Sequence, residues 1–199
     1  VSGATIGSTA NALDLQVATL GARATGGLFL QEADGITIGD VTVAVQRVTA
    51  GASAGAVNDS VLSDLRTLTG AAHIVLVAGG SITLTQGSDA DGMAVQAAGT
   101  GNILLQATGA GSSIDALANA DIAAATGRIS MVAAGALRFA ANADVTTSST
   151  VDLEATTGSI TQSSTSIASG SAVRLLAAQD VTIGSLVAAG NVSVSGPAG

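Results

Sequence analysis

The fold-determining segments are Ile129-Ser-Met-Val-Ala133, Val151-Asp-Leu-Glu-Ala155 and Val173-Arg-Leu-Leu-Ala177. Each begins with an apolar residue, alternates and ends in Ala, and each starts 22 residues after the one before. Period-2 alternation over five residues is typical of a β-strand with one buried face. The sequence therefore predicts one strand repeated at a fixed interval.

Each of these strands has two shorter companions. A second apolar strand follows each one, at Leu137–Phe139, Ile160–Gln162 and Val181–Ile183. A third precedes each, marked by Ile122, Val145 and Ile167, and the first two of these directly follow the identical tetrads Ala-Asn-Ala-Asp at 118–121 and 141–144. Three short strands joined by Gly, Ser, Thr, Asn and Asp predict a parallel β-helix, and the handedness of parallel crossovers favours a right-handed one.

The same pattern extends toward the N-terminus with less regular spacing. First strands are expected to start at Ile6, Leu28, Ile74, Ile103, Ile129, Val151, Val173 and Val192. Earlier second strands are expected at Leu13–Leu15, Ile36–Ile38, Ile82–Leu84 and Ile114, and earlier third strands at Val41–Val43 and Met93–Val95. About eight coils, each covering the apolar face of the last at roughly 4.8 Å, would make a rod about 40 Å long.

The 46-residue interval between Leu28 and Ile74 predicts one insertion, at 46–70. Within it, 57–68 has apolar residues at i, i+4, i+8 and i+11 behind the capping candidates Asn58, Asp59 and Ser60, which predicts a short helix. Such a helix could cover apolar surface of the rod, or the insertion could contact a partner.

Composition excludes several classes of function. The chain of 199 residues has 14 acidic residues against six Arg and no Lys, a net charge of −8, so a nucleic-acid partner is not expected. It has no Cys for disulfide or thiol chemistry. Because no apolar run approaches the roughly 18 to 20 residues of a membrane span, membrane insertion is not expected either.

Asp89-Ala-Asp91-Gly92 is the one motif with the appearance of a metal ligand set, since it resembles the start of a calcium loop. Position 12 counted from Asp89 is Thr100, where an EF-hand needs Glu. We therefore expect an exposed acidic turn and no bound metal, with calcium near Asp89 and Asp91 as the open alternative.

Two other groups of polar residues are candidates for catalysis. Asp152 and Glu154 share the outward face of one strand, and paired carboxylates can hydrolyse glycosides. His73 is the single histidine and is expected at a corner of the coil. Neither has the partners that catalysis needs, so no catalytic residue and no cofactor is expected, although a polysaccharide-degrading enzyme is an alternative.

Three segments, 34–39, 158–163 and 180–194, resemble the haemagglutinin-type repeats of large bacterial surface proteins such as filamentous haemagglutinin-like adhesins. The resemblance implies an exported β-helical shaft at the cell surface or in a secreted fibre. We therefore expect residues 1–199 to be a single β-solenoid module from a longer tandem array.

The expected function is that of a non-catalytic structural module stacked end to end with adjacent copies or modules. The alternative is an adhesive module that binds a glycan or protein, as on a host or neighbouring cell surface, through the 46–70 insertion and the Asp89 turn.

Overall fold

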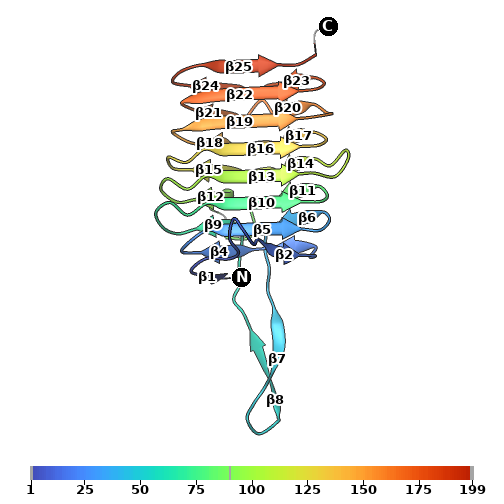
Figure 1. The fold of residues 1–199 in the computed structure, drawn as a ribbon, viewed down its shortest axis with the longest axis vertical. Helices are drawn as coiled ribbons and strands as arrows, with labels where there is room; N and C mark the ends of the chain where they lie inside the picture. The colour runs from blue at the N-terminus through green and yellow to red at the C-terminus, as the bar shows by residue number, and fades with distance from the viewer. Residues whose placement is uncertain (1, 90, 198–199) are drawn as a thin grey trace.

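The chain forms a parallel β-helix (Figure 1). The computed structural model describes residues 2–89 and 91–197. Three parallel sheets of eight, eight and seven strands enclose the core, and a two-stranded antiparallel sheet lies apart from them. In Figure 1 the strands of the front sheet run from left to right while the chain rises from blue to red, so the coil is right-handed. The predicted fold class is confirmed.

The first sheet contains the strand that the sequence pattern identified most clearly. Its members are β2 (Leu13–Leu15), β5 (Leu28–Glu32), β10 (Ile74–Ala78), β13 (Ile103–Ala107), β16 (Ile129–Ala133), β19 (Thr150–Ala155), β22 (Ala172–Ala177) and β25 (Val192–Ser195). Every predicted start residue from Leu28 to Val192 pairs with the next one along the rod, and Ile6 joins Leu28 through an isolated parallel bridge. The predicted register of this sheet is therefore correct.

The other two sheets complete each coil. The second sheet contains β3 (Thr19–Leu20), β6 (Ile36–Ile38), β11 (Ile82–Leu84), β14 (Ile114–Ala116), β17 (Leu137–Phe139), β20 (Ile160–Gln162) and β23 (Val181–Thr182). The third contains β1 (Ser2–Gly3), β4 (Ala22–Ala24), β9 (Leu65–Thr67), β12 (Met93–Ala97), β15 (Asp121–Ala124), β18 (Val145–Thr146), β21 (Ile167–Gly170) and β24 (Ser185–Ala188).

Two strand predictions near the N-terminus are wrong. Leu13–Leu15 belongs to the first sheet, where Leu13 pairs with Leu30, because the chain leaves this sheet after Ile6 and returns to it. Val41–Val43 is not a third strand: Val41 pairs in antiparallel fashion with Leu62, and β9 takes the third-sheet position of this coil.

The predicted helix at 57–68 is also wrong, since the insertion is a β-hairpin. Its strands are β7 (Ala44–Val48) and β8 (Ala54–Asn58), and Figure 1 shows it extending beyond the N-terminal end of the rod. Val57 pairs with Val45 in the hairpin, whereas Leu65 is fully buried in β9, so the helix-like spacing joins residues of two different structures. The described residues form no helix, so none has the length or hydropathy to cross a membrane.

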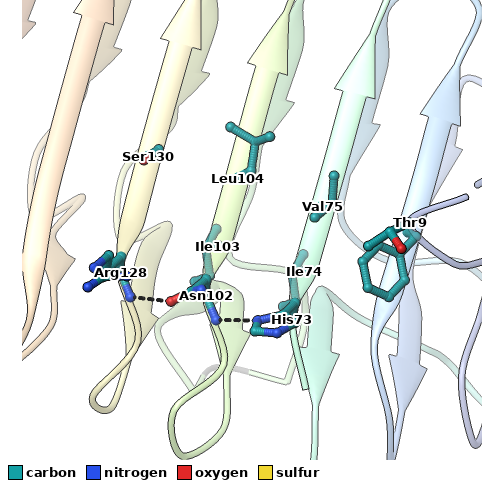
Figure 2. A pocket seen from close by; sticks show the side chains of 10 residues that line it. Thr9, His73, Ile74, Val75, Asn102, Ile103, Leu104, Arg128 and Ser130 are labelled. Atoms are coloured by element: carbon teal, nitrogen blue, oxygen red, sulfur yellow. Dashed lines mark hydrogen bonds between the residues drawn. The ribbon is translucent and has the colours of Figure 1, made fainter. Parts of the chain in front are cut away.

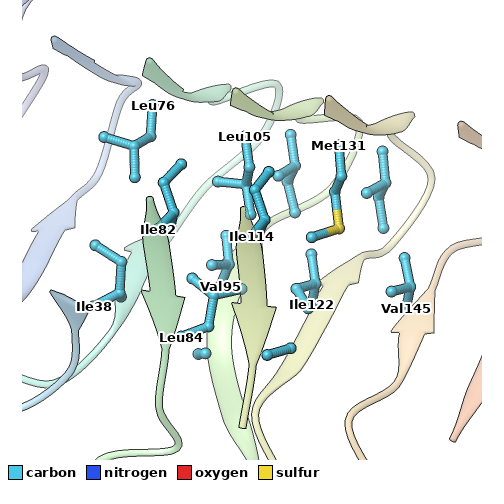
Figure 3. Close-up of a cluster of buried hydrophobic side chains, with 14 of the residues drawn as sticks. Ile38, Leu76, Ile82, Leu84, Val95, Leu105, Ile114, Ile122, Met131 and Val145 are labelled. Carbon is cyan, nitrogen blue, oxygen red and sulfur yellow. The ribbon is translucent and has the colours of Figure 1, made fainter. Parts of the chain in front are cut away.

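The core consists of columns of like side chains that run along the rod. Figure 3 shows Ile82, Leu105 and Ile122 converging from three sheets on the same interior. One column holds Leu30, Leu76, Leu105, Met131, Leu153 and Leu175, each at most 1% exposed. Apolar side chains of similar size in successive coils bury one another, which makes the core continuous from coil to coil.

The two Ala-Asn-Ala-Asp tetrads are stacked corners. Asn119 and Asn142 have φ values of 59° and 56°, in the left-handed region that Asn tolerates, and the Asn142 amide donates to Asn119 Oδ1 at 3.1 Å. Asp121 Oδ1 accepts the backbone N–H of Asp144 at 2.9 Å. Burial raises the pKa of the Asp121 carboxyl. The two identical tetrads therefore form the same turn in two adjacent coils, and their side chains bond one coil to the other.

Candidate functional site

Asp64, Asp89 and Asp91 form a carboxylate cluster, here called the acidic corner. One carboxylate oxygen of each lies within 4.8 Å of those of the other two. Asp64 directly precedes β9, and Asp91 precedes β12, which is the neighbour of β9 in the third sheet. The acidic corner therefore joins two successive coils. Ala90, which separates Asp89 from Asp91, is outside the described residues.

Asp64 is the unusual member of the acidic corner. It is 2% exposed, and its Oδ1 atom is buried without a hydrogen-bond partner. Its φ of 64° is in the left-handed region. Burial, followed by the charges of Asp89, Asp91 and Asp40, raises the pKa of Asp64 to about 7. Nothing in the local sequence around Ser63-Asp64 indicated this burial, because Ser-Asp pairs are common in exposed turns.

A second layer of hydrogen bonds holds the loop that carries Asp89. Asp40 Oδ1 accepts from the Ser63 hydroxyl at 2.5 Å and from the Ser88 backbone N–H at 3.0 Å. These bonds lower the pKa of Asp40. A Cβ atom on Gly87 would come within 2.8 Å of Asp40 Oδ1, and the φ of Gly87 is 73°. The loop is thus packed closely against the coil below.

Asp91 has a fixed orientation. Its Oδ1 accepts the Met93 backbone N–H at 2.8 Å, and its Oδ2 pairs with Arg66 Nη1 at 3.2 Å. Each carboxylate oxygen has two lone pairs, so both atoms can still bind a cation. The acidic corner can therefore present oxygen ligands from one buried and two exposed carboxylates.

His73 lies at a corner, directly before β10, and lines a pocket on the outward side of the first sheet (Figure 2). Its Nδ1 accepts the Asn102 backbone N–H at 3.0 Å, and Asn102 Oδ1 accepts the Arg128 backbone N–H at 2.8 Å. Phe29 adds apolar surface, and no carboxylate lines the pocket among the described residues. His73 therefore bonds one coil to the next, and the pocket brings no acid–base pair together.

Asp152 and Glu154 share a partner on the outward face of the first sheet. Arg174, the register neighbour of Asp152, donates to both Asp152 oxygens at 2.6 and 2.9 Å and to Glu154 Oε2 at 2.9 Å. The hydrogen bond to Asp152 is the main reason that the pKa of Arg174 is raised. The two carboxylates thus form an ion-pair network between coils, and exposed pairs of this kind each contribute about 0 to 1 kcal/mol to stability.

Glu32 is a buried carboxylate that the sequence reasoning missed. It is fully buried at a position where the next five coils have Ala, from Ala78 to Ala177. Its oxygens accept the Val17 backbone N–H at 3.3 Å and the Ala33 N–H at 3.1 Å. The break in the Ala column was the available signal. Glu32 satisfies backbone donors near the irregular first coil.

Comparison with protein-family models, curated proteins and solved structures gives no match. Candidate functions therefore follow from the sequence and the geometry of the chain itself.

Proposed function

We propose that the protein is a non-catalytic structural module of an extracellular bacterial fibre or adhesin stalk, stacked end to end with neighbouring modules. In this role the rod supplies reach and stiffness. The extracellular setting rests on the resemblance of 34–39, 158–163 and 180–194 to surface-protein repeats. The stacking rests on the last coil.

The exposed core positions of the last coil carry the proposal. Val192 and Val194 pair with Val173 and Leu175 one coil below, where the same positions are 2% and 0% exposed. In β25 the two valines are 46% and 44% exposed because no described coil covers them. The outer edge of β25 has no neighbouring strand among the described residues. A further coil with apolar residues at these positions would cover both valines and take up the backbone groups of this edge.

Sedimentation velocity over micromolar to millimolar concentrations tests the stacking. We expect the wild-type chain to associate with increasing concentration and the Val192→Glu/Val194→Glu variant to remain monomeric. Val187→Glu is the control, since Val187 is also exposed (55%) but pairs with Ser169, which is not a core residue, in the coil below. A wild-type chain that stays monomeric at millimolar concentration would contradict end-to-end stacking.

An adhesive function is the second candidate, favoured by the hairpin. β7 and β8 project from the rod, and Val45 and Val48 are 50% and 71% exposed. Deleting the whole predicted insertion, 46–70, would remove the core strand β9. The structure supports a cleaner one: Val41 and Leu62 bond to each other at 2.9 Å in both directions, so 42–61 can be replaced by Asn-Gly in a two-residue turn. Loss of cell or glycan attachment in this variant would favour the adhesive function.

A further inference from the structure

We infer that the acidic corner is a calcium site in which Asp64, Asp89 and Asp91 hold one ion between two successive coils. This site does not depend on the proposed fibre role. It would bind calcium whether or not the rods stack.

The buried Asp64 oxygen is the first reason. A buried polar atom without a partner costs roughly 1 to 3 kcal/mol, and more when it belongs to a charged group. Asp64 Oδ1 is such an atom, and a second carboxylate oxygen of the cluster is within 4.8 Å of an oxygen of Asp64. A cation among the three carboxylates supplies the missing partner.

The balance of charge is the second reason. Asp89, Asp91 and Asp40 repel the charge on Asp64, and the cation that acts against them is Arg66. Arg66 Nη1 bonds Asp91 at 3.2 Å. The positive charge of Arg66 therefore offsets only one of the four carboxylate charges. A divalent cation would offset most of the negative charge that remains.

The geometry admits calcium, and the ligand chemistry favours it over zinc and copper. Calcium–oxygen distances are about 2.3 to 2.6 Å, so ligands on opposite sides of the ion are up to about 5 Å apart, whereas the corresponding limit for magnesium is about 4.2 Å. The three oxygens of the acidic corner lie within 4.8 Å of one another, so a single calcium ion can contact all of them. All three ligands are carboxylates, which calcium prefers and which do not favour zinc or copper.

The ion would fasten the loop before β12 to the corner before β9. Asp89 and Asp91 come from the upper coil and Asp64 from the coil below. The hydrogen bonds from Ser63 and Ser88 to Asp40 already hold the two chain segments together. Calcium binding therefore requires little rearrangement of the backbone, and it should stabilise the coil next to the hairpin.

Isothermal titration of the full chain with calcium chloride, after dialysis against EDTA, tests the site. We expect one ion per chain with a Kd of about 10⁻⁴ M, at the weak end of the range for calcium sites in proteins. Asp64→Asn should weaken binding at least about tenfold, since it removes the buried charge while Asn tolerates the positive φ. Asp115→Asn is the control, because Asp115 pairs with Arg138 on another sheet. Magnesium should bind more weakly than calcium.

Thermal unfolding supplies a second readout. Calcium should raise the Tm of the wild-type chain and leave that of Asp64→Asn unchanged, while Asp64→Asn in EDTA should be at least as stable as the wild type. Should Asp64→Asn fail to fold, the exposed-site variants Asp89→Asn and Asp91→Asn replace it. No saturable binding at millimolar calcium, or equal binding by wild type and folded carboxylate variants, would overturn the proposal.

Discussion

The central coils and the β7–β8 hairpin are both built of short strands that contain apolar residues, yet they bury these residues to opposite extents. Leu105 in the rod is fully buried, whereas Val48 in the hairpin is 71% exposed. Leu105 has a coil above and a coil below, while the hairpin is covered by neither. Alternation of apolar and polar residues is therefore enough to form a strand, but the apolar residues are buried only where another coil stacks on that strand.

The largest expected effect is a core truncation in the middle of the rod. Leu105→Ala should lower the free energy of unfolding by about 2 to 5 kcal/mol, because it leaves a cavity in the buried column of leucine and methionine side chains. Val45→Ala in the hairpin is the matched truncation and should change it by less than about 0.5 kcal/mol. Urea unfolding followed by circular dichroism measures both. Equal losses would show that the hairpin is as much a part of the core as the coils.

A smaller loss is expected from Glu32→Ala. Although it restores the Ala of later coils, it removes the acceptor of the Val17 N–H, so we expect about 1 to 2 kcal/mol of destabilisation. The Ala33 N–H keeps its bond to the Leu15 backbone oxygen at 3.0 Å. Glu32→Gln retains one oxygen acceptor and should lose less. If Glu32→Ala is as stable as the wild type, the buried carboxylate has no structural role in the first coils.

Gln162 offers a gain in stability of the rod. It is 3% exposed, stacked on Phe139, and neither atom of its amide has a hydrogen-bond partner. Gln162→Leu should therefore raise the free energy of unfolding by about 1 kcal/mol. Thr161→Val, on the outward side of the same strand, is the comparison and should change it less. A destabilised Gln162→Leu would mean that the amide is bonded in solution.

The smallest change is expected when the hairpin is removed. Replacing 42–61 with Asn-Gly keeps the Val41–Leu62 pair and leaves β9 in place, so the Tm of the rod should fall by no more than a few degrees. Differential scanning calorimetry compares this variant with the wild type. A collapse of the unfolding transition would show that the hairpin is needed to fold the rod.

Much of the rod could be predicted from the sequence because its information is local. Ile129, Val151 and Val173 each start a five-residue alternation that ends in Ala, and each pairs with the next. The identical tetrads stack for the same reason: one backbone turn and one set of side-chain bonds is repeated. Such features are visible without any knowledge of distant contacts.

The errors occurred where an alternating strand has to be assigned to a sheet. Leu13–Leu15 has the pattern of any strand of the coil, and its place in the first sheet depends on the excursion after Ile6. The spacing of Val57, Val61 and Leu65 imitates a helix although the chain between them leaves the hairpin and enters the core. The sheet that a strand joins depends on the length of the preceding loop and on where the chain re-enters the coil. Neither can be recognised from a short stretch of sequence.

The candidate site was half predicted. Asp89 and Asp91 stood out by their spacing, but Asp64 is 25 residues before Asp89 and is brought beside it only by the pairing of β9 with β12. The cluster forms only because two coils pair in this register, so a search for motifs along the chain does not find it.

Hydrogen exchange of backbone amides, resolved by residue, tests the central claim most directly. If each coil is completed by its neighbours, amides of β13 and β16 should exchange most slowly, those of β25 faster, and those of β7 and β8 by local opening without unfolding of the rod. Hairpin amides as slow as those of β13, or exchange that is uniform from β2 to β25, would contradict the account.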